Sequence, residues 1–133
     1  MEHTAAGDIQ WDPAPEEHFT GRVWFGPLDS PRRDGGLNAL GVMFEPGART
    51  DWHDHPDGQV LYITAGAGFV QRRDGRTAKV SAGDVVYAPA GEVHWHGATP
   101  STPMTHLSLT TGGATAWLDD KVTDDEYRSA SDA

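Results

Sequence analysis

Short strand-like runs, separated by frequent turn signals, limit what this chain of 133 residues can fold into. The runs are rich in β-branched and aromatic residues, and pairs such as Pro46-Gly47 and Asp74-Gly75 stand between them. About ten short strands with turns every few residues predict an all-β fold, either a β-sandwich or a β-barrel. The expected strands are Arg22–Phe25, Leu37–Phe44, Asp51–His55, Val60–Thr64, Gly68–Arg72, Ala78–Val80, Val85–Ala88, Val93–His96, Thr105–Thr110 and Thr115–Leu118.

The chain has the length of one domain, because two halves would each be too small to bury a core. Residues 1–18 are polar and without periodicity, and we expect an N-terminal arm there. Residues 19–118 form the expected barrel, and residues 119–133 form an acidic C-terminal segment. Within that segment, Thr123 and Glu126 fit a capping box, which predicts one short helix.

Charged residues are unevenly distributed along the chain. The formal net charge is −10, but residues 1–17 contain five acidic residues and no Lys or Arg, and residues 119–133 contain six acidic residues and two basic ones. The body of the protein is therefore nearly neutral. A phosphate-binding surface needs clustered positive charge, so the charge pattern argues against a nucleic-acid partner.

The composition also excludes several kinds of site. The chain contains no cysteine, which excludes disulfides, thiolate metal sites and cysteine nucleophiles. The first residues lack the basic and apolar regions of a signal peptide. No apolar run approaches the ~18 residues that a membrane span needs. We therefore expect a cytoplasmic protein that does not contact a membrane.

Three histidines and one glutamine form the pattern that carries chemistry. His53 and His55 are two residues apart on an expected strand, so their side chains point to the same face. Gln59 follows a turn that can fold the chain back toward this pair, and His94 lies on a later strand. A lone H-x-H pair could equally be a surface feature. Together, however, neutral imidazoles and a Gln carbonyl can bind a divalent transition metal.

The residues around these histidines match two known motifs, in order. Residues from Gly47 to Gln59 match G-x5-H-x-H-x3-[E/Q], and residues from Gly83 to His94 match G-x5-P-x-G-x2-H. On these motifs the chain resembles a single-domain cupin. The resemblance implies a double-stranded β-helix, a jelly-roll-like barrel with a metal inside. The ligands that it implies are His53, His55, Gln59 and His94.

Further stretches are similar to a narrower subgroup, which includes the bacterial manganese-dependent cupin hydroxynitrile lyases. They include the residues from His94 to Pro100 and the run Met104-Thr105-His106. This resemblance implies cyanohydrin cleavage and synthesis, manganese as the metal and His106 as the acid–base residue. It also implies a substrate pocket that includes Leu40, Val42, His96 and Thr110. The chain departs from the subgroup at two of these positions, where we align a small residue with Leu40 and a glutamine with Thr110.

A neutral glutamine in place of a carboxylate ligand has a chemical consequence. Three neutral histidines and one neutral glutamine leave the full charge on the metal, which makes it a stronger Lewis acid. This favours lyase, isomerase or hydrolytic chemistry over oxygenation.

Other functions fit the same residues. One is a dioxygenase or isomerase of a small metabolite, because cupins host many reactions on one metal site. Another is a non-catalytic module that binds a small ligand and keeps its metal. The donor set suits Mn, Fe, Ni, Co and Zn alike.

Small cupins usually pair, so we expect a homodimer or higher homo-oligomer with the arm packed across the partner. Trp11, Trp24 and Trp117 are expected to anchor the arms. His3 and His18 lie in or next to the N-terminal arm, where we expect them to be solvated.

Overall fold

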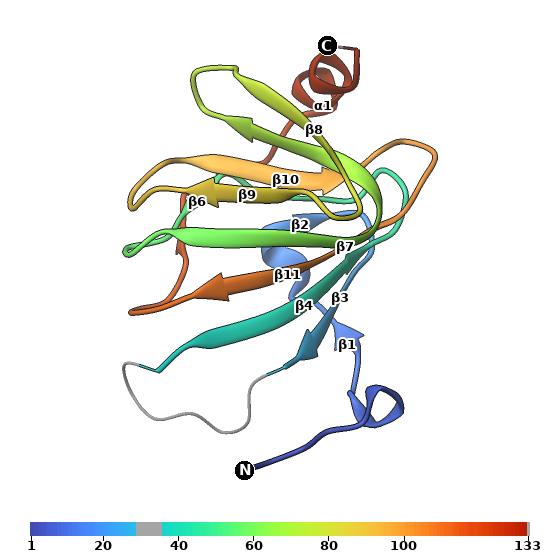
Figure 1. Cartoon of the computed structure of the whole chain (residues 1–133). Coiled ribbons are helices and arrows are strands. Elements are labelled where there is room, and N and C mark those ends of the chain that lie inside the picture. Colours follow the sequence, from blue (N-terminus) through green and yellow to red (C-terminus); the bar gives the residue numbers. More distant parts are fainter. Residues whose placement is uncertain (29–35, 133) are drawn as a thin grey trace.

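The structure is a computed structural model that describes residues 1–28 and 36–132. Part of the expected barrel (29–35) and the last residue of the C-terminal segment lie outside the described residues. Most regular structure in the described residues is β-strand, and one α-helix lies near the C-terminal end (Figure 1). The all-β prediction and the short C-terminal helix are therefore confirmed. No helix in this part of the chain is long and apolar enough to cross a membrane.

Most strands follow the expected runs, with ends that differ by a few residues. In chain order they are β1 (Asp12–Pro13), β2 (Phe19–Thr20), β3 (Val23–Pro27), β4 (Asn38–Phe44), β5 (Arg49–Thr50), β6 (His53–Asp54), β7 (Gln59–Arg72), β8 (Thr77–Ser81), β9 (Val85–Ala88), β10 (His94–Ala98), β11 (Met104–Thr110) and β12 (Ala116–Trp117). The short strands β1, β2 and β5 were not expected. The helical elements are η1 (Ala6–Asp8), η2 (Glu16–His18) and α1 (Asp124–Ser131).

All strand pairs are antiparallel, and the sheet curls into two facing layers (Figure 1). One layer contains β1, β3, β4, β11, the first half of β7 and β9. The other contains β8, the second half of β7, β10, β5 and β2, with β6 and β12 alongside. The long strand β7 is thus shared by both layers and connects them.

A bend at Gly66 allows β7 to pass from one layer to the other. Two separate strands, Val60–Thr64 and Gly68–Arg72, are expected from the sequence, but the structure joins them into one. Gly66 has a φ of 76°, and a Cβ there would lie 1.9 Å from the carbonyl oxygen of Pro103. Only glycine fits this position, so the chain bends here within one strand instead of ending it.

The core lies between the two layers. Alternate residues of β4, β7 and β11 point inward and are fully buried, among them Phe44, Leu61, Ile63 and Met104. The ring of Phe44 lies 5.4 Å from the ring of His106, centroid to centroid. The apolar core is therefore continuous with the buried histidines described below.

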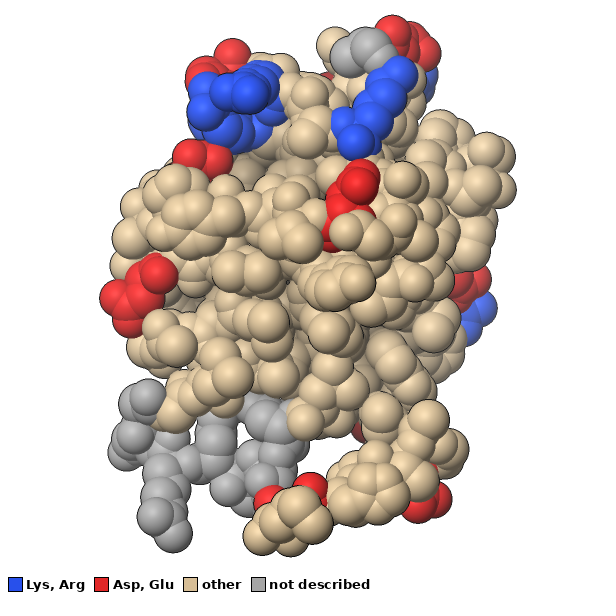
Figure 2. Space-filling model, in the orientation of Figure 1, with Lys and Arg blue, Asp and Glu red and all other residues tan. Residues whose placement is uncertain are grey.

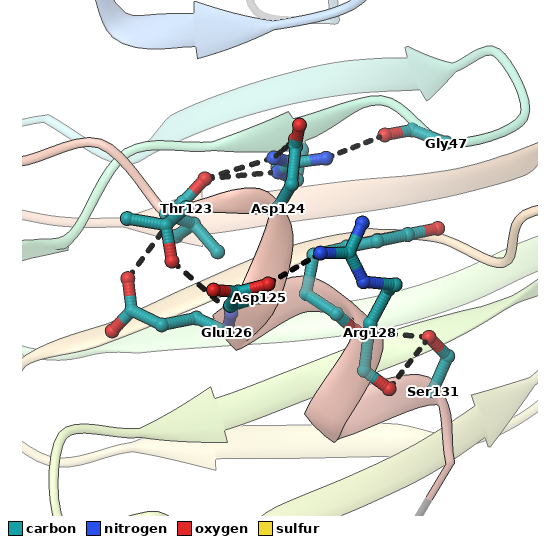
Figure 3. A network of polar contacts seen from close by, with 10 residues as sticks. Gly47, Thr123, Asp124, Asp125, Glu126, Arg128 and Ser131 are labelled. Atoms are coloured by element: carbon teal, nitrogen blue, oxygen red, sulfur yellow. Dashed lines mark hydrogen bonds and ion pairs between the residues drawn. The ribbon is translucent and has the colours of Figure 1, made fainter.

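The helix α1 closes the outer side of the second layer. The capping box is formed as expected (Figure 3). The Thr123 side chain accepts a hydrogen bond from the backbone N–H of Glu126, and the Glu126 side chain accepts one from the backbone N–H of Thr123. Such a cap stabilises a helix by about 1 kcal/mol. Arg49 is buried and donates to the Val122 carbonyl and to Asp124. An outer apolar cluster lies beneath the helix and consists of Trp52, Phe69, Trp95, Val122, Tyr127 and Ala130.

The arm is anchored on its own chain through Trp11. Its strand β1 pairs with β3, and the indole of Trp11 covers Gly26 and Gly41. A Cβ at Gly26 would lie 2.8 Å from that indole, and one at Gly41 would lie 2.7 Å from it. Small residues are therefore needed at both positions for this close approach.

Candidate metal centre

A small interior cavity lies between the two layers and encloses about 60 Å³. Nine different strands contribute to its wall, so side chains far apart in the sequence meet there. Its lining consists of Phe19, Phe25, Leu40, Val42, Thr50, His53, His55, Gln59, His96, His106, Ser108, Thr115 and Trp117. Of the expected pocket residues, Leu40, Val42 and His96 line this cavity, whereas Thr110 lines an adjoining one of about 230 Å³.

The structure brings the four expected ligands together. His53 lies directly opposite His94 in the pairing of β6 with β10, and their ring centroids are 4.5 Å apart. The ring of His55 lies 5.2 Å from that of His53 and 5.9 Å from that of His94. The Gln59 carbonyl oxygen Oε1 lies 3.0 Å from Nε2 of His94. Strand pairing and the turn before Gln59 thus bring these four side chains to one place.

A second grouping of histidines overlaps with this one. His53, His94 and His96 offer ring nitrogens that all lie within 4.8 Å of one another, close enough to hold one metal ion. His96 is two residues after His94 on β10 and shares its inward face. His96 was expected in the substrate pocket, and it lies beside the candidate metal centre as well.

Backbone carbonyls determine which nitrogen of two histidines carries the proton. Nδ1 of His53 lies 2.9 Å from the Asp51 carbonyl oxygen, and Nδ1 of His94 lies 2.8 Å from the Glu92 carbonyl oxygen. A carbonyl oxygen can only accept, so Nδ1 is the donor in both rings and Nε2 keeps a lone pair. Such backbone contacts are typical of histidines that bind metals.

Burial keeps the clustered histidines neutral. Loss of solvent is the main cause that lowers the pKa of His53 and His96 well below its ordinary value, and the nearby histidines lower it further. The same causes lower the pKa of His55 to about 4. Burial also lowers the pKa of His94, and lowers that of His106 to about 3. At neutral pH each ring therefore offers a lone pair and no positive charge, as a metal ligand or base requires.

Three of the histidines that line the cavity each have a buried ring nitrogen with no hydrogen-bond partner within residues 1–28 and 36–132. They are Nε2 of His55, Nε2 of His96 and Nδ1 of His106. Buried polar atoms are normally paired, because an unpaired one costs about 1–3 kcal/mol. These three atoms are therefore available to a metal or a small ligand in the cavity.

His106 and His96 form a hydrogen-bonded pair. Nε2 of His106 lies 3.0 Å from Nδ1 of His96, and their rings meet at 67°. Both side chains are fully buried and line the cavity. His106 thus lies on the cavity wall, where the sequence places it, and its direct partner is the second pocket histidine.

Aromatic residues close the cavity on the side of the arm. The ring of His18 stacks on Trp117 at 4.3 Å, and the Trp117 ring lies 4.8 Å from that of His53. His18 thus packs on a residue of the cavity wall and its side chain is 22% exposed, so it is half-buried and not freely solvated as expected. Burying a ring against an aromatic partner is more favourable than leaving it in water. The alternation of side chains along the strand that contains Trp117 gave no indication that its ring would pack between His18 and His53.

Comparisons with known proteins agree with this arrangement. A family model described as "Cupin domain" matches residues 41–110 of this chain. The chain is 44% identical over 131 residues to an (R)-mandelonitrile lyase of Granulicella tundricola. The alignment covers 96% of this chain and 99% of that protein.

Two solved structures share the fold. A cupin-like protein of Thermotoga maritima has a TM-score of 0.86 and 40% identity, covering 91% of this chain and 93% of its own. A polyketide cyclase of Streptomyces resistomycificus has a TM-score of 0.78 at 20% identity, covering 96% of this chain and 91% of its own. The expected barrel fold is thereby confirmed. The chain belongs to the cupin family.

Proposed function

We propose that this protein is a metal-dependent lyase that cleaves cyanohydrins into a carbonyl compound and hydrogen cyanide, and that it also catalyses the reverse addition. The observation that carries the proposal is the meeting of four neutral donors and a buried histidine pair at one small cavity. The relative of Granulicella tundricola, which bears the name (R)-mandelonitrile lyase, supports the same reaction.

The contact between His94 and Gln59 supports a cation at this site. Nδ1 of His94 donates to the Glu92 carbonyl, so its Nε2 carries a lone pair. Nε2 of Gln59 donates to Oγ of Ser108 at 2.8 Å, which turns Oε1 toward His94. Two acceptors 3.0 Å apart repel each other, and a positive ion between them removes that repulsion. The donor set therefore fits a metal ion.

The residues that would hold the metal are His53, His55, Gln59 and His94. Their imidazole nitrogens and amide oxygen suit manganese, and also iron, cobalt, nickel and zinc. When bound, the metal supplies Lewis-acid stabilisation of negative charge on the substrate oxygen or on the departing cyanide.

The histidine pair moves the proton. His106 takes the proton of the substrate hydroxyl, the C–CN bond breaks and its electron pair leaves with cyanide, and the C–O bond becomes a carbonyl. The pair then returns the proton to cyanide, which yields hydrogen cyanide. No proton or electron is left over.

The pairing of His106 with His96 keeps one base available. If Nε2 of His106 donates to Nδ1 of His96, the lone pair lies on Nδ1 of His106. If the proton of the contact belongs to His96, the lone pair lies on Nε2 of His96 instead. Among the described residues both of these buried outer nitrogens are without a partner, so the pair presents one acceptor and one donor in either arrangement.

Metal content and turnover together test the proposal. Protein purified without added metal is analysed for its elements, and the release of benzaldehyde from mandelonitrile is followed by absorbance. We expect about one divalent transition metal per chain, turnover that a chelator removes and added metal restores, and neither metal nor turnover in His94→Ala. Metal-bearing wild-type protein that releases no benzaldehyde would contradict the lyase proposal.

A further inference from the structure

The cavity at the metal centre is small and adjoins a second cavity, here called the mouth cavity. It encloses about 60 Å³, while the adjoining mouth cavity encloses about 230 Å³. The two share four lining residues: Leu40, His55, Ser108 and Thr115. A substrate whose reacting carbon lies in the inner cavity can therefore extend its remaining part into the mouth cavity.

The inward face of β4 changes from apolar to polar at the mouth cavity. Every second residue of the strand points inward, in the order Val42, Leu40 and Asn38 from the inner end. Val42 and Leu40 line the inner cavity, and Leu40 and Asn38 line the mouth cavity. The alternation of the expected strand already placed Asn38 on this face, although the sequence did not mark it as functional.

Asn38 lacks a partner for a buried atom. Its side-chain oxygen Oδ1 is buried, and within the described residues it has no hydrogen-bond partner. Thr110 lies directly opposite Asn38 in the pairing of β4 with β11, and it lines the same mouth cavity. The side chains of Asn38 and Thr110 therefore lie side by side on the wall of the mouth cavity.

Ser108 adds a third polar group, at the boundary between the two cavities. Its Oγ accepts from Nε2 of Gln59, so the hydroxyl hydrogen of Ser108 remains free to be donated to another group. Ser108 lines both cavities. An apolar phenyl ring in the mouth cavity would leave the Asn38 oxygen without a donor, whereas a ligand hydroxyl can donate to that oxygen and accept from Ser108.

From this arrangement we propose that the mouth cavity binds a hydroxyl group on the outer part of the substrate, and that Asn38 and Thr110 recognise it. The substrate class is then a small cyanohydrin with a second hydroxyl remote from the reacting carbon, such as a phenolic one. This inference rests on the proposed lyase function, and it assigns the specificity of that reaction to two residues outside the metal centre.

Paired substrates and variants test the inference. The kcat/KM values are measured for mandelonitrile and for its 3-hydroxy and 4-hydroxy derivatives with wild type, Asn38→Leu, Thr110→Val and the control Thr105→Val. Thr105 lies on the same strand as Thr110 but on its outer face. For each protein, kcat/KM for a hydroxylated substrate is divided by kcat/KM for mandelonitrile. Comparing this ratio between proteins cancels the electronic effect of the phenolic hydroxyl on the reaction.

We expect wild type and Thr105→Val to share a preference for one hydroxylated substrate. The loss of one hydrogen bond reduces binding by about 3- to 10-fold, so we expect Asn38→Leu and Thr110→Val each to reduce the ratio by about that factor. A ratio that is the same in wild type and in both pocket variants would overturn the inference. Thermal unfolding of each variant shows whether it is folded.

A binding measurement separates this inference from the lyase proposal. Calorimetry compares the affinities of benzaldehyde and of 3- and 4-hydroxybenzaldehyde for the metal-bearing protein, and it needs no turnover. If wild type cleaves no cyanohydrin but binds a hydroxylated aldehyde more tightly, and Asn38→Leu loses that preference, the lyase proposal fails and the subsite stands. Equal affinities in wild type and in Asn38→Leu would overturn the subsite even in an active lyase.

Discussion

Nε2 of His106 lies 3.0 Å from Nδ1 of His96, and both rings are fully buried in the wall of one cavity. Each neutral imidazole carries one proton on nitrogen. One of the two protons lies in the hydrogen bond, so one outer nitrogen carries the other proton and the second outer nitrogen keeps a lone pair. The proposed base is therefore a property of two residues, and its strength depends on the contact as well as on His106 itself.

His106→Gln is expected to separate proton transfer from metal binding. The glutamine keeps a polar partner for His96 but cannot take a proton, so turnover of mandelonitrile falls by ~10²–10⁴-fold while the metal content stays that of wild type. Benzaldehyde release and elemental analysis measure the two quantities. His94→Ala serves as the contrast, since it loses both. Wild-type turnover in His106→Gln would move the proton transfer to another group.

Two single variants distinguish the ligand sets that the geometry allows. His55→Ala is expected to lower the metal content, because Nε2 of His55 is a proposed ligand atom. His96→Ala is expected to keep the metal, even though His96 lies close to His53 and His94. Elemental analysis after dialysis against a weak chelator measures both. The reverse result would replace His55 by His96 in the metal centre.

Acid is expected to destabilise the metal-free protein through its buried histidines. The folded pKa values of His55 and His106 lie at about 4 and about 3, below the unfolded value near 6.5. The unfolded chain therefore binds more protons as the pH falls below 6.5, and the stability that these groups contribute above that pH is lost.

Each histidine that stays neutral in the fold should cost about 1.4 kcal/mol of unfolding free energy per pH unit between about 6.5 and its folded pKa. Urea unfolding at pH 7, 6 and 5 measures the slope. We expect His106→Gln to show a slope shallower by about that amount. Parallel curves for the two proteins would mean that His106 is not held neutral.

Replacement of Leu40 by Ala is expected to widen the passage between the two cavities. Leu40 lines both of them, so its removal should raise kcat/KM for bulky aromatic cyanohydrins relative to mandelonitrile, on the order of tenfold. Leu109→Ala is the matched control, because Leu109 lies on the outer face of β11 and on neither cavity wall. An unchanged ratio in Leu40→Ala would place the bulky group elsewhere.

We expect the protein to form a homodimer. Tyr62, Val85 and Tyr87 are 44%, 64% and 64% exposed, and they lie on the paired strands β7 and β9. Figure 2 shows that the face over these strands carries few charged side chains. A second copy of the chain would cover this apolar surface. Light scattering at micromolar concentration should give twice the 14.3 kDa of one chain, and Tyr87→Glu should lower that mass while Lys79→Glu should not.

The short-range features of this protein could be read from its sequence. Alternation along a strand placed His53 and His55 on one face, and the capping box at Thr123 marked the start of α1. Each depends on residues a few positions apart, whose geometry the backbone determines locally. The spacing of the two cupin motifs identified His94 and Gln59 as partners of that pair, because the resemblance carries the long-range arrangement with it.

Other features depended on the tertiary structure. Two separate strands were expected on either side of Gly66, yet the chain bends there beside Pro103 and continues as the single strand β7. His18 reads as a solvated residue, yet it stacks on Trp117. The sequence determined which residues face inward and which could bind a metal, because strand period and turn chemistry are local. Only the tertiary structure decided which of those residues touch, including His96 with His106 and Asn38 opposite Thr110, because such contacts are set by the register between strands far apart in the chain.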